Sequence, residues 1–514
     1  MNLSTNLKLK KKKANLLLFL IKLKISTYSI LVSIIAACTY FLTLAPTYSW
    51  GDSSDFTIRL QVGNFSPSES FSWEATSRDY DIFEKVLSVF RYLPIVPIEA
   101  RANLASAFFG AVSVGLTTYL AGIISNSRRV AVLAGVILLV SHTFWLLSVV
   151  AEVYTFTLVL LLALYINVEK YYQTGSNKYL MFMGLLTGLI ISHHSLGIIA
   201  ACSQLPVLSS IINKKYFRKI LIWSTSTFIA SIIYLKSFFE KMLSGEEFLI
   251  ALGVSLPSNT YFQVNLFEEV TRYFMFMVYN FPIIVLLLLA LKSMKFTNLR
   301  NLSMREYALF AFITSIVGIS STIPDKYNIY VLVYPYIAVL VSRKVSQFMR
   351  LLKVPLVKFA SITCILAIVS PIIYWSTYKT ANIFNINLSQ ARTLQERDNN
   401  KYFLWPPKQN DFGPKVLTDR IMQELPANAI LLVDYTIYMP LKYEQFVANK
   451  RTDVTLAFIE QVLPNGLYDF VLKNSDHRVF LAANTPPNYY GLDNLDERLE
   501  VSQKDSIFEL KLVG

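Results

Sequence analysis

The sequence predicts a polytopic α-helical membrane protein with about 11 transmembrane helices, followed by a C-terminal extracytoplasmic α/β domain. Hydrophobic residues make up 54% of the 514 residues and charged residues only 16%, whereas a typical soluble domain has about 25% charged residues. Mean hydropathy is +0.44. Apolar stretches of about 20 residues, enough to cross roughly 30 Å of hydrocarbon, recur along the chain and stop near Tyr378.

The charges between these stretches predict a topology, because Lys and Arg of short loops stay in the cytoplasm. Residues 1–26 form a basic cytoplasmic tail, residues 27–376 the transmembrane domain, with a large first outer loop at 46–101, and residues 377–514 a soluble extracytoplasmic domain. We expect the protein in a bacterial inner membrane or an ER-type membrane. The spans are expected at 27–45, 102–124, 130–149, 153–168, 179–195, 196–212, 220–236, 271–291, 306–323, 328–342 and 359–376.

The net charge of +14 follows from this orientation, because the basic residues gather in inner loops, where they also meet anionic lipid head groups. It gives no reason to expect a nucleic-acid partner. The three cysteines, Cys38, Cys202 and Cys364, fall within predicted spans. They predict neither a disulfide framework nor a metal site.

Two carboxylates, Asp52 and Asp55, directly follow the first predicted span in Trp50-Gly51-Asp52-Ser53-Ser54-Asp55-Phe56. A carboxylate at this membrane surface can act as general base on a hydroxyl group within hydrogen-bond reach. The pair could equally form a turn in which Asp52 caps an interfacial helix. Residue spacing alone does not separate these two interpretations.

Glu152 and Tyr154 lie in the very short outer connection Ala151-Glu152-Val153-Tyr154-Thr155. So short a turn keeps the carboxylate close to the bundle, where it can face the same cavity as Asp52. The alternative is a charge that merely ends a hydrophobic helix. Ionisable groups near membrane depth are expensive and are often retained for function.

The adjacent residues His193 and His194 occupy the next predicted outer turn. Their imidazoles could bind a phosphate, a metal or a transferring proton. Neighbouring residues on a helix point about 100° apart, so the pair suits a phosphate better than a single metal ion, and helix capping is the alternative. Lys326, at another outer turn, offers a cation for a lipid phosphate or an interfacial anchor.

Several of these segments together resemble a known family. Asp52-Ser53-Ser54-Asp55 resembles the Asp-x-Gly-Glu motif of the domain of unknown function 2723 family, which includes transmembrane protein O-mannosyltransferases. Residues 151–155 look like its Ala-Glu-Val-Tyr-Thr element, and Gly188 to His194 its Gly-Leu-x-x-x-x-His segment. Tyr443-Glu444-Gln445 and Lys450-Arg451-Thr452-Asp453-Val454 are similar to patterns in the tails of bacterial members.

This resemblance implies a C-type glycosyltransferase fold and a polyprenyl-phosphate sugar as donor. Asp52 would then be the base that deprotonates the acceptor hydroxyl, and Asp55 its partner or a residue that orients the acceptor. Glu152 and Tyr154 would line the cavity. The basic and imidazole groups of the outer face are implied to bind donor or acceptor: His193, His194, Lys326 and Arg78.

The chain departs from the family in two places. Ser54-Asp55 stands where the family has Gly-Glu, which shortens one carboxylate by a methylene group. Ala75-Thr76-Ser77-Arg78-Asp79-Tyr80-Asp81-Ile82-Phe83 replaces a His-Pro-Pro-Gly-Tyr-Pro segment and keeps only the tyrosine. We therefore expect the specificity of this protein, or a loss of activity, to reside between Arg78 and Phe83.

The tail alternates strand-like and helical runs, which is typical of a small α/β domain. Asp434, at the end of the first run, occupies the place where open α/β sheets bind ligands, although capping of the following turn explains it as well. The strands are expected at 429–433, 454–458, 479–483 and 507–513, and helices near 415–425, 439–449 and 459–473.

Two classes of function follow from the sequence. The first is an enzyme that moves a mannose-like sugar from a polyprenyl phosphate to a hydroxyl group of a protein or glycan on the outer face. The alternative is a transporter or flippase of a lipid-linked saccharide, or a catalytically altered membrane scaffold. No cofactor is firmly implied, although the paired carboxylates could hold a divalent cation.

Overall fold

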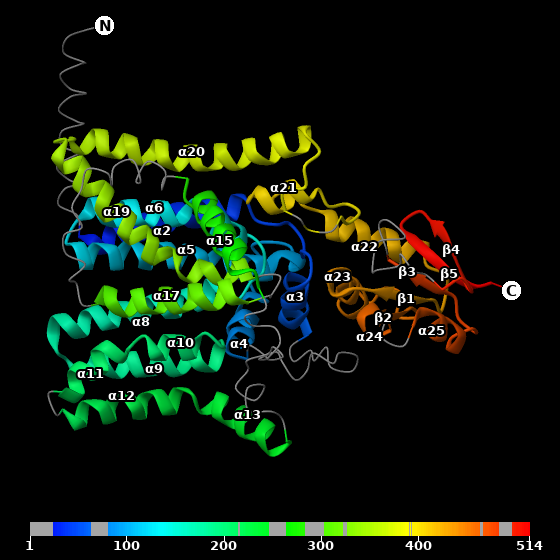
Figure 1. The fold of residues 1–514 in the computed structure, drawn as a ribbon, viewed down its shortest axis with the longest axis horizontal. Helices are drawn as coiled ribbons and strands as arrows, with labels where there is room; N and C mark the ends of the chain where they lie inside the picture. Colours follow the sequence, from blue (N-terminus) through cyan, green and yellow to red (C-terminus); the bar gives the residue numbers. More distant parts are fainter. Residues whose placement is uncertain are drawn as a thin grey trace, which may run out of the picture.

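The computed structural model shows a bundle of long helices and, at one end of it, a smaller unit of helices and strands (Figure 1). The basic tail, the stretch around Arg78 and the second half of the predicted span 271–291 lie outside the described residues. The described residues are 24–62, 81–213, 216–245, 264–282, 303–321, 326–389, 391, 393–462, 466–482 and 496–513.

Helices occupy the predicted spans, several of them in two pieces. The longer ones are α2 (Ile25–Leu42), α5 (Arg101–Ser125), α6 (Arg128–Leu139), α8 (Tyr154–Thr174), α9 (Asn177–His193), α12 (Phe217–Ala230), α15 (Leu266–Asn280), α17 (Ser303–Ser320), α19 (Tyr334–Leu351) and α20 (Leu356–Ile383). The shorter ones are α7 (His142–Leu147), α10 (Gly197–Cys202), α11 (Leu205–Asn213), α13 (Ile232–Leu243), α18 (Lys326–Ile329) and η5 (Tyr330–Leu332).

Length and composition identify fewer membrane spans than the sequence predicts. In the part of the chain that the structure describes, 3 helices are long and apolar enough to cross a membrane, or up to 5 if each of two bent helix pairs is one span. The predicted number of about 11 therefore stays a prediction. The three are Ile25–Leu42, Ile98–Ser125 and Lys358–Ile383.

Small and hydroxyl side chains let the bundle helices approach one another closely. Ser29 and Ser33 of α2 donate hydrogen bonds to backbone carbonyl groups of α5, at 2.6 Å to Gly115 and 2.8 Å to Ala111. A methyl group added to Gly110 of α5 would lie 2.4 Å from the hydroxyl oxygen of Ser148. This packing by small residues is typical of helices in lipid.

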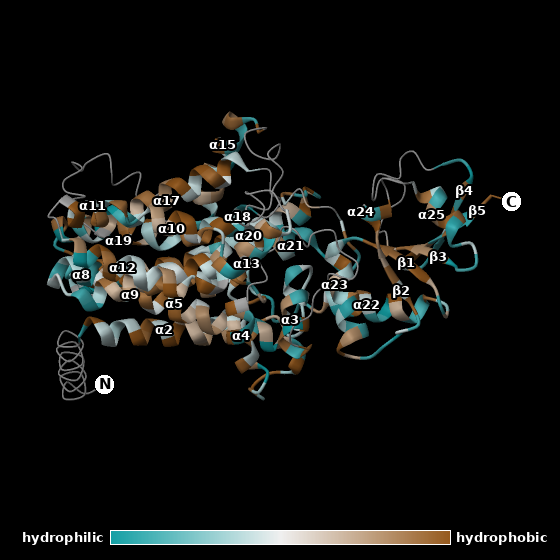
Figure 2. Ribbon diagram, turned by 90° about the horizontal axis from the view of Figure 1, so that it is seen from below, coloured by the Kyte–Doolittle hydropathy of each residue, from teal (hydrophilic) through white to brown (hydrophobic). Residues whose placement is uncertain are grey.

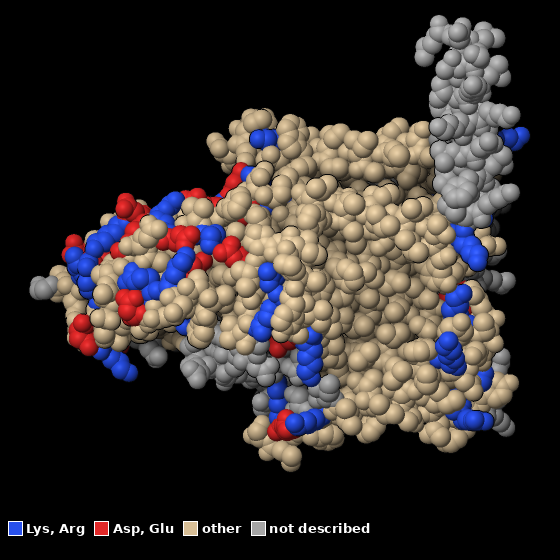
Figure 3. Space-filling model, turned by 180° about the vertical axis from the view of Figure 1, so that it is seen from behind, with Lys and Arg blue, Asp and Glu red and all other residues tan. Residues whose placement is uncertain are grey.

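The surface of the bundle is that of an integral membrane protein. Brown, hydrophobic residues cover the long helices in Figure 2, whereas teal, hydrophilic residues are frequent on the smaller unit. Figure 3 shows a broad band of bundle surface without charged side chains, and mainly Lys and Arg at the end opposite the smaller unit. Exposed basic residues at helix termini of that end include Arg128, Lys178, Lys353 and Lys358.

The smaller unit is an α/β domain around a five-stranded sheet of order β2-β1-β3-β5-β4. Its central pairs β1–β2 and β1–β3 are parallel, whereas β3–β5 and β4–β5 are antiparallel. The strands are β1 (Ile430–Val433), β2 (Thr455–Phe458), β3 (Val479–Leu481), β4 (Leu499–Lys504) and β5 (Ile507–Leu512). The helices are α21 (Asn399–Leu404), α22 (Gly413–Glu424), α23 (Tyr435–Phe446), α24 (Ile459–Val462) and α25 (Leu467–Lys473).

The segment between α2 and α5 is built into the core of this α/β domain. Tyr48, Trp50 and Ile58 are buried in the same apolar cluster as the sheet residues. The Tyr48 hydroxyl lies 2.6 Å from the Glu444 carboxylate of α23 and 2.8 Å from the Thr418 hydroxyl of α22. After this contact the loop continues as α3 (Asp52–Val62), α4 (Asp81–Phe90) and η3 (Ile98–Ala100).

The tail motifs singled out in the sequence hold the domain together. Glu444 is fully buried, and its carboxylate pairs with Lys450 at 2.7 Å. The Gln445 amide donates to the carbonyl groups of Arg451 and Val454. The Arg451 guanidinium donates to three carbonyl groups at the end of α22. These residues therefore have structural roles in this chain.

We predict that Tyr48→Phe weakens the docking of the first loop. The substitution removes the hydroxyl group that serves both Glu444 and Thr418, and the loss of a buried hydrogen bond to a charged group costs about 1.5–3 kcal/mol. The melting temperature of the detergent-solubilised protein should fall. The control Tyr92→Phe alters a side chain that is 76% exposed, and an equal melting temperature for both variants would contradict the prediction.

Candidate active site

The acidic pair begins helix α3, which lies between the bundle and the α/β domain (Figure 1). The chain turns into the helix at Gly51, whose φ of +57° suits glycine, and the Ser54 amide donates to the Gly51 carbonyl at 2.9 Å. Asp52 and Asp55 occupy the first helical turn, where the helix dipole favours negative charge. A helix therefore follows Gly51, and both carboxylates belong to its first turn.

Asp55 is buried within an ion-pair network. Its Oδ2 accepts a hydrogen bond from Arg59 Nε at 2.9 Å, and Arg59 also pairs with Glu84 of α4. Its Oδ1 is buried and has no hydrogen-bond partner among the described residues. Burial raises the pKa of Asp55 to about 6 against the opposing charge of Arg59, and the nearby Asp52 carboxylate adds to the rise.

Asp52 lies at the more open end of the same helical turn. Its side chain is exposed, and its Oδ1 accepts a hydrogen bond from the Tyr435 hydroxyl of the α/β domain at 2.6 Å. Desolvation by the surrounding protein raises the pKa of Asp52, while the Tyr435 hydrogen bond and the Arg59 charge lower it. A carboxylate in this setting suits general-base chemistry near neutral pH.

The connection that carries Glu152 is bonded directly to α3. The Ala151 amide donates to the Ser53 hydroxyl at 3.1 Å, and the Glu152 amide donates to the Ser106 hydroxyl of α5 at 2.9 Å. The Glu152 side chain is half-buried, and its charge acts on Tyr402. The structure thus places the backbone of this connection beside the first turn of α3, and the role of the Glu152 carboxylate stays a prediction.

His193 is the last residue of α9, and His194 follows it as the C-cap. His193 is fully buried, with Nε2 at 3.0 Å from the Thr157 hydroxyl oxygen. His194 is also buried, and its ring lies 5.7 Å from that of Tyr154. A hydroxyl partner and full burial leave His193 less accessible to a phosphate than the sequence suggested.

A row of aromatic rings joins His193 to the helix of the acidic pair. The ring of Phe83 on α4 lies 6.2 Å from His193 and 5.3 Å from Phe56 on α3. Phe83 belongs to the segment that departs from the family motif, and it is fully buried. The structure therefore brings three predicted site segments, those of the acidic pair, Glu152 and the histidines, around α3 and α4.

Lys326 belongs to a different polar cluster. Its Nζ lies 2.6 Å from the Glu269 carboxylate and 2.9 Å from the Ser321 carbonyl oxygen, and Glu269 also pairs with Arg272. Within the described ranges, no hydrogen bond or ion pair joins Lys326 to the acidic pair. The assignment of Lys326 as a phosphate-binding residue stays a prediction, and Arg78 lies outside the described residues.

Sequence reasoning missed Tyr435, the hydroxyl group that contacts Asp52. It had singled out Asp434, because this residue follows a strand at the edge where open sheets bind ligands. In the structure Asp434 caps α23, with Oδ1 accepting from the Thr436 amide at 2.7 Å. The next residue, Tyr435, contacts Asp52 instead. The end of strand β1 was therefore the right place in the chain, but the side chain singled out there was the wrong one.

Lys408 is a second polar residue that the sequence analysis did not select. It is 3% exposed, its Nζ donates to the Trp405 carbonyl at 2.5 Å, and its charge lies over the ring of Tyr402. Burial lowers the pKa of Lys408 to about 7, while Asp411 opposes this change. The Tyr402 hydroxyl lies 3.1 Å from the Ser49 hydroxyl, so this group borders the acidic loop.

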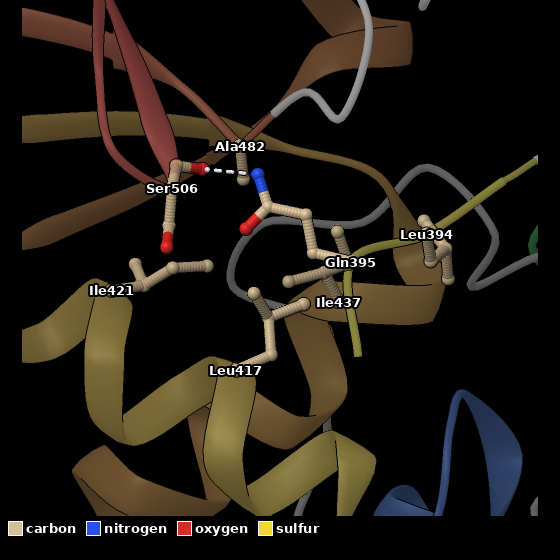
Figure 4. A pocket seen from close by; sticks show the side chains of 7 residues that line it. All are labelled: Leu394, Gln395, Leu417, Ile421, Ile437, Ala482 and Ser506. Carbon is tan, nitrogen blue, oxygen red and sulfur yellow. Dashed lines mark hydrogen bonds between the residues drawn. The ribbon is translucent and has the colours of Figure 1, made fainter. Parts of the chain in front are cut away.

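A small pocket of about 190 Å³ lies within the α/β domain (Figure 4). Ile437 and Ala482 follow β1 and β3 and line it together with Leu417 and Ile421 of α22. Its side chains are mainly apolar, and the Gln395 amide donates to the Ser506 carbonyl at 3.4 Å. We assign no catalytic role to this pocket. Among the described side chains, no group of three or more His, Cys, Asp or Glu could hold a metal ion.

Comparisons with known proteins identify the fold. The family model "Protein O-mannosyl-transferase TMEM260 N-terminal domain" matches residues 80–216, a range that includes Glu152, Tyr154, His193 and His194 but not the acidic pair. No curated protein matches the chain. The wider resemblance to the domain of unknown function 2723 family stays a prediction.

Solved structures similar to this chain are membrane-embedded transferases. ArnT from Cupriavidus metallidurans in the apo state has a TM-score of 0.58 at 12% identity over 94% of this chain and 97% of that chain. ArnT bound to undecaprenyl phosphate has a TM-score of 0.54 at 12% identity over 94% and 98%. The Archaeoglobus fulgidus oligosaccharyltransferase in the apo form has a TM-score of 0.49 at 11% identity over 90% and 70%. The chain therefore shares the overall fold of ArnT.

We predict that Asp55 makes folding stability depend on pH in a defined direction. A carboxyl group whose pKa rises from 3.8 to about 6 on folding favours the folded state when protonated, so its contribution is lost as pH rises through that interval. In Asp55→Asn this pH dependence is absent. The melting temperature of wild type minus that of the variant should therefore decrease as pH rises from 4 to 7. A constant difference would refute the prediction.

Proposed function

We propose that this protein is a membrane glycosyltransferase that moves a mannose-like sugar from a polyprenyl-phosphate donor to a hydroxyl group of a protein or glycan. The reaction takes place on the extracytoplasmic face, with the N-terminus in the cytoplasm and the α/β domain outside. Asp52 is the base that takes the proton of the acceptor hydroxyl. The observation that carries this proposal is an exposed carboxylate at the junction of the bundle and the α/β domain.

The surroundings of Asp52 support this role. A hydroxyl nucleophile needs a positioned base near neutral pH, and both carboxyl groups of the pair have a raised pKa. Asp55 and Arg59 form the charged support beneath the base. Glu152 lines the same region, and His193, His194 and Lys326 are the groups we assign to the donor phosphate.

The similar structures support a lipid-linked donor. ArnT, whose fold this chain shares, has been solved bound to undecaprenyl phosphate. A polyprenyl phosphate keeps its chain in the bilayer and its head group at the surface, next to the end of the bundle where α3 lies. The matched family model, which bears the name of a protein O-mannosyl-transferase, supports mannose as the sugar and a protein as the acceptor.

The activity can be tested with purified full-length protein in detergent or proteoliposomes. Labelled undecaprenyl-phosphate mannose and related polyprenyl-phosphate sugars are supplied with a protein and glycan extract, with and without EDTA. Transfer of label to the protein or glycan fraction supports the proposal, and loss of transfer in EDTA indicates a divalent cation. Label that changes only its leaflet in proteoliposomes would instead identify a flippase.

We predict that Asp52→Asn abolishes transfer while expression and membrane insertion persist. An amide cannot accept the acceptor proton, and the loss of a general base lowers rates by roughly 10²–10⁴. The control is Asp476→Asn, because this carboxylate is 77% exposed and lies on the α/β domain. Unchanged transfer by Asp52→Asn would remove Asp52 from the mechanism.

A further inference from the structure

We propose that Tyr435 is a positioning residue for the base: its hydroxyl holds one oxygen of Asp52 and leaves the other oxygen to an acceptor hydroxyl. This inference rests on the proposed function, because it assigns Asp52 the role of base. It makes the α/β domain a part of the active site rather than a separate module. The contact joins residues that are 383 positions apart in the sequence.

The geometry of Asp52 fits a base held from one side. Oδ1 accepts the Tyr435 hydroxyl at 2.6 Å, a short distance that is typical of a hydroxyl donor to a carboxylate. No other hydrogen bond to this carboxylate occurs within the described ranges, so Oδ2 is available. Because the side chain is exposed, a substrate hydroxyl could reach that oxygen.

Tyr435 is itself firmly supported. It is the first residue of α23, directly after the cap Asp434 and the buried strand β1. The adjacent Thr436 carbonyl accepts a hydrogen bond from the Gly51 amide at 3.2 Å. This backbone hydrogen bond ties the start of α23 to the residue before Asp52, and it therefore holds Tyr435 beside the start of α3.

The charges around Asp52 give the contact a chemical consequence. The groups that face it are Asp55 and Arg59 from α3 and Tyr435 from α23, while Glu84 from α4 acts through Arg59. The Tyr435 hydrogen bond and Arg59 lower the pKa of Asp52, in opposition to desolvation. Tyr435 has a pKa well above its usual value, so it stays protonated and remains a donor.

The amino termini of two helices also meet at this carboxylate. Helix α3 begins at Asp52 and helix α23 begins at Tyr435. Both helix dipoles favour a negative charge at their first turn. Both helix termini and the Tyr435 hydroxyl of the docked domain thus favour the ionised base, in opposition to desolvation, and the base can act only when it is ionised.

The test compares Tyr435→Phe with wild type and with the control Tyr443→Phe, which removes the same atom from the same helix. Protonation of Asp52 is followed through labelling by a water-soluble carbodiimide and glycine ethyl ester, which modify protonated carboxyl groups, with mass spectrometry of the Asp52 peptide from pH 4 to pH 8. Loss of the hydrogen bond should move the labelling midpoint upward by roughly one pH unit or more. The control should keep the wild-type midpoint.

The second measurement is the pH dependence of transfer, with the polyprenyl-phosphate sugar and the acceptor fraction that wild type uses. Tyr435→Phe should lose transfer activity mainly at low pH, because the acid limb of its pH–rate profile shifts to higher pH together with the labelling midpoint of Asp52. A variant with the wild-type midpoint and profile would overturn the inference and leave the proposed function intact. Several-fold faster transfer at every pH would also overturn it, because Tyr435 would then block the acceptor.

The two proposals can fail separately. If wild type transfers none of the labelled sugars but the labelling midpoint still moves in Tyr435→Phe, the proposed function fails and the hold of Tyr435 on Asp52 stands. If Tyr435→Phe and Tyr443→Phe shift the labelling midpoint of Asp52 and lower the melting temperature by the same amounts, the effect comes from helix α23 as a whole. That outcome also overturns a specific role for the hydroxyl.

Discussion

The docking of residues 48–52 onto the α/β domain is the contact on which the candidate site depends. Tyr48 enters the domain core and bonds Glu444, Gly51 bonds the start of α23, and Asp52 receives the Tyr435 hydroxyl. These contacts follow one another along five residues that connect α2 to α3. They set where α3 begins, and therefore where its carboxylates lie.

Opposing electrostatic effects act on the two carboxylates next to that contact. Two carboxylates one helical turn apart repel each other, and desolvation by the surrounding protein disfavours both charges. Arg59 offsets part of this by pairing with Asp55, and Glu84 holds the guanidinium from the other side. Asp52, which lacks a direct ion pair with Arg59, receives a neutral hydroxyl instead. The two acids therefore have different environments, which suits a base and its support.

The sequence predicted the elements better than the contacts between them. Uninterrupted apolar runs marked helices such as α2 and α5, and buried runs marked β1 and β3, because hydrophobic patterning is local information. Strand β4 was missed because Leu499–Lys504 is mainly polar and lies at the sheet edge. The partner of Asp52 could not be predicted, because nothing in a single sequence pairs residue 52 with residue 435. The Glu269 partner of Lys326 was missed for the same reason.

The two carboxylates also bear on the alternative that this protein is a catalytically altered scaffold, which the unusual segment ending at Phe83 suggested. The Phe83 ring lies between those of Phe56 and His193, so the start of α4 packs against both the helix of the acidic pair and the histidines. Asp55 has a buried Oδ1 without a hydrogen-bond partner among the described residues, and burial of a charged carboxylate in this way is unfavourable. Buried groups with raised pKa values beside an exposed carboxylate are characteristic of functional sites. The acidic pair therefore favours an enzyme, and it directs the question of specificity to the surface that α4 and the α/β domain present to Asp52.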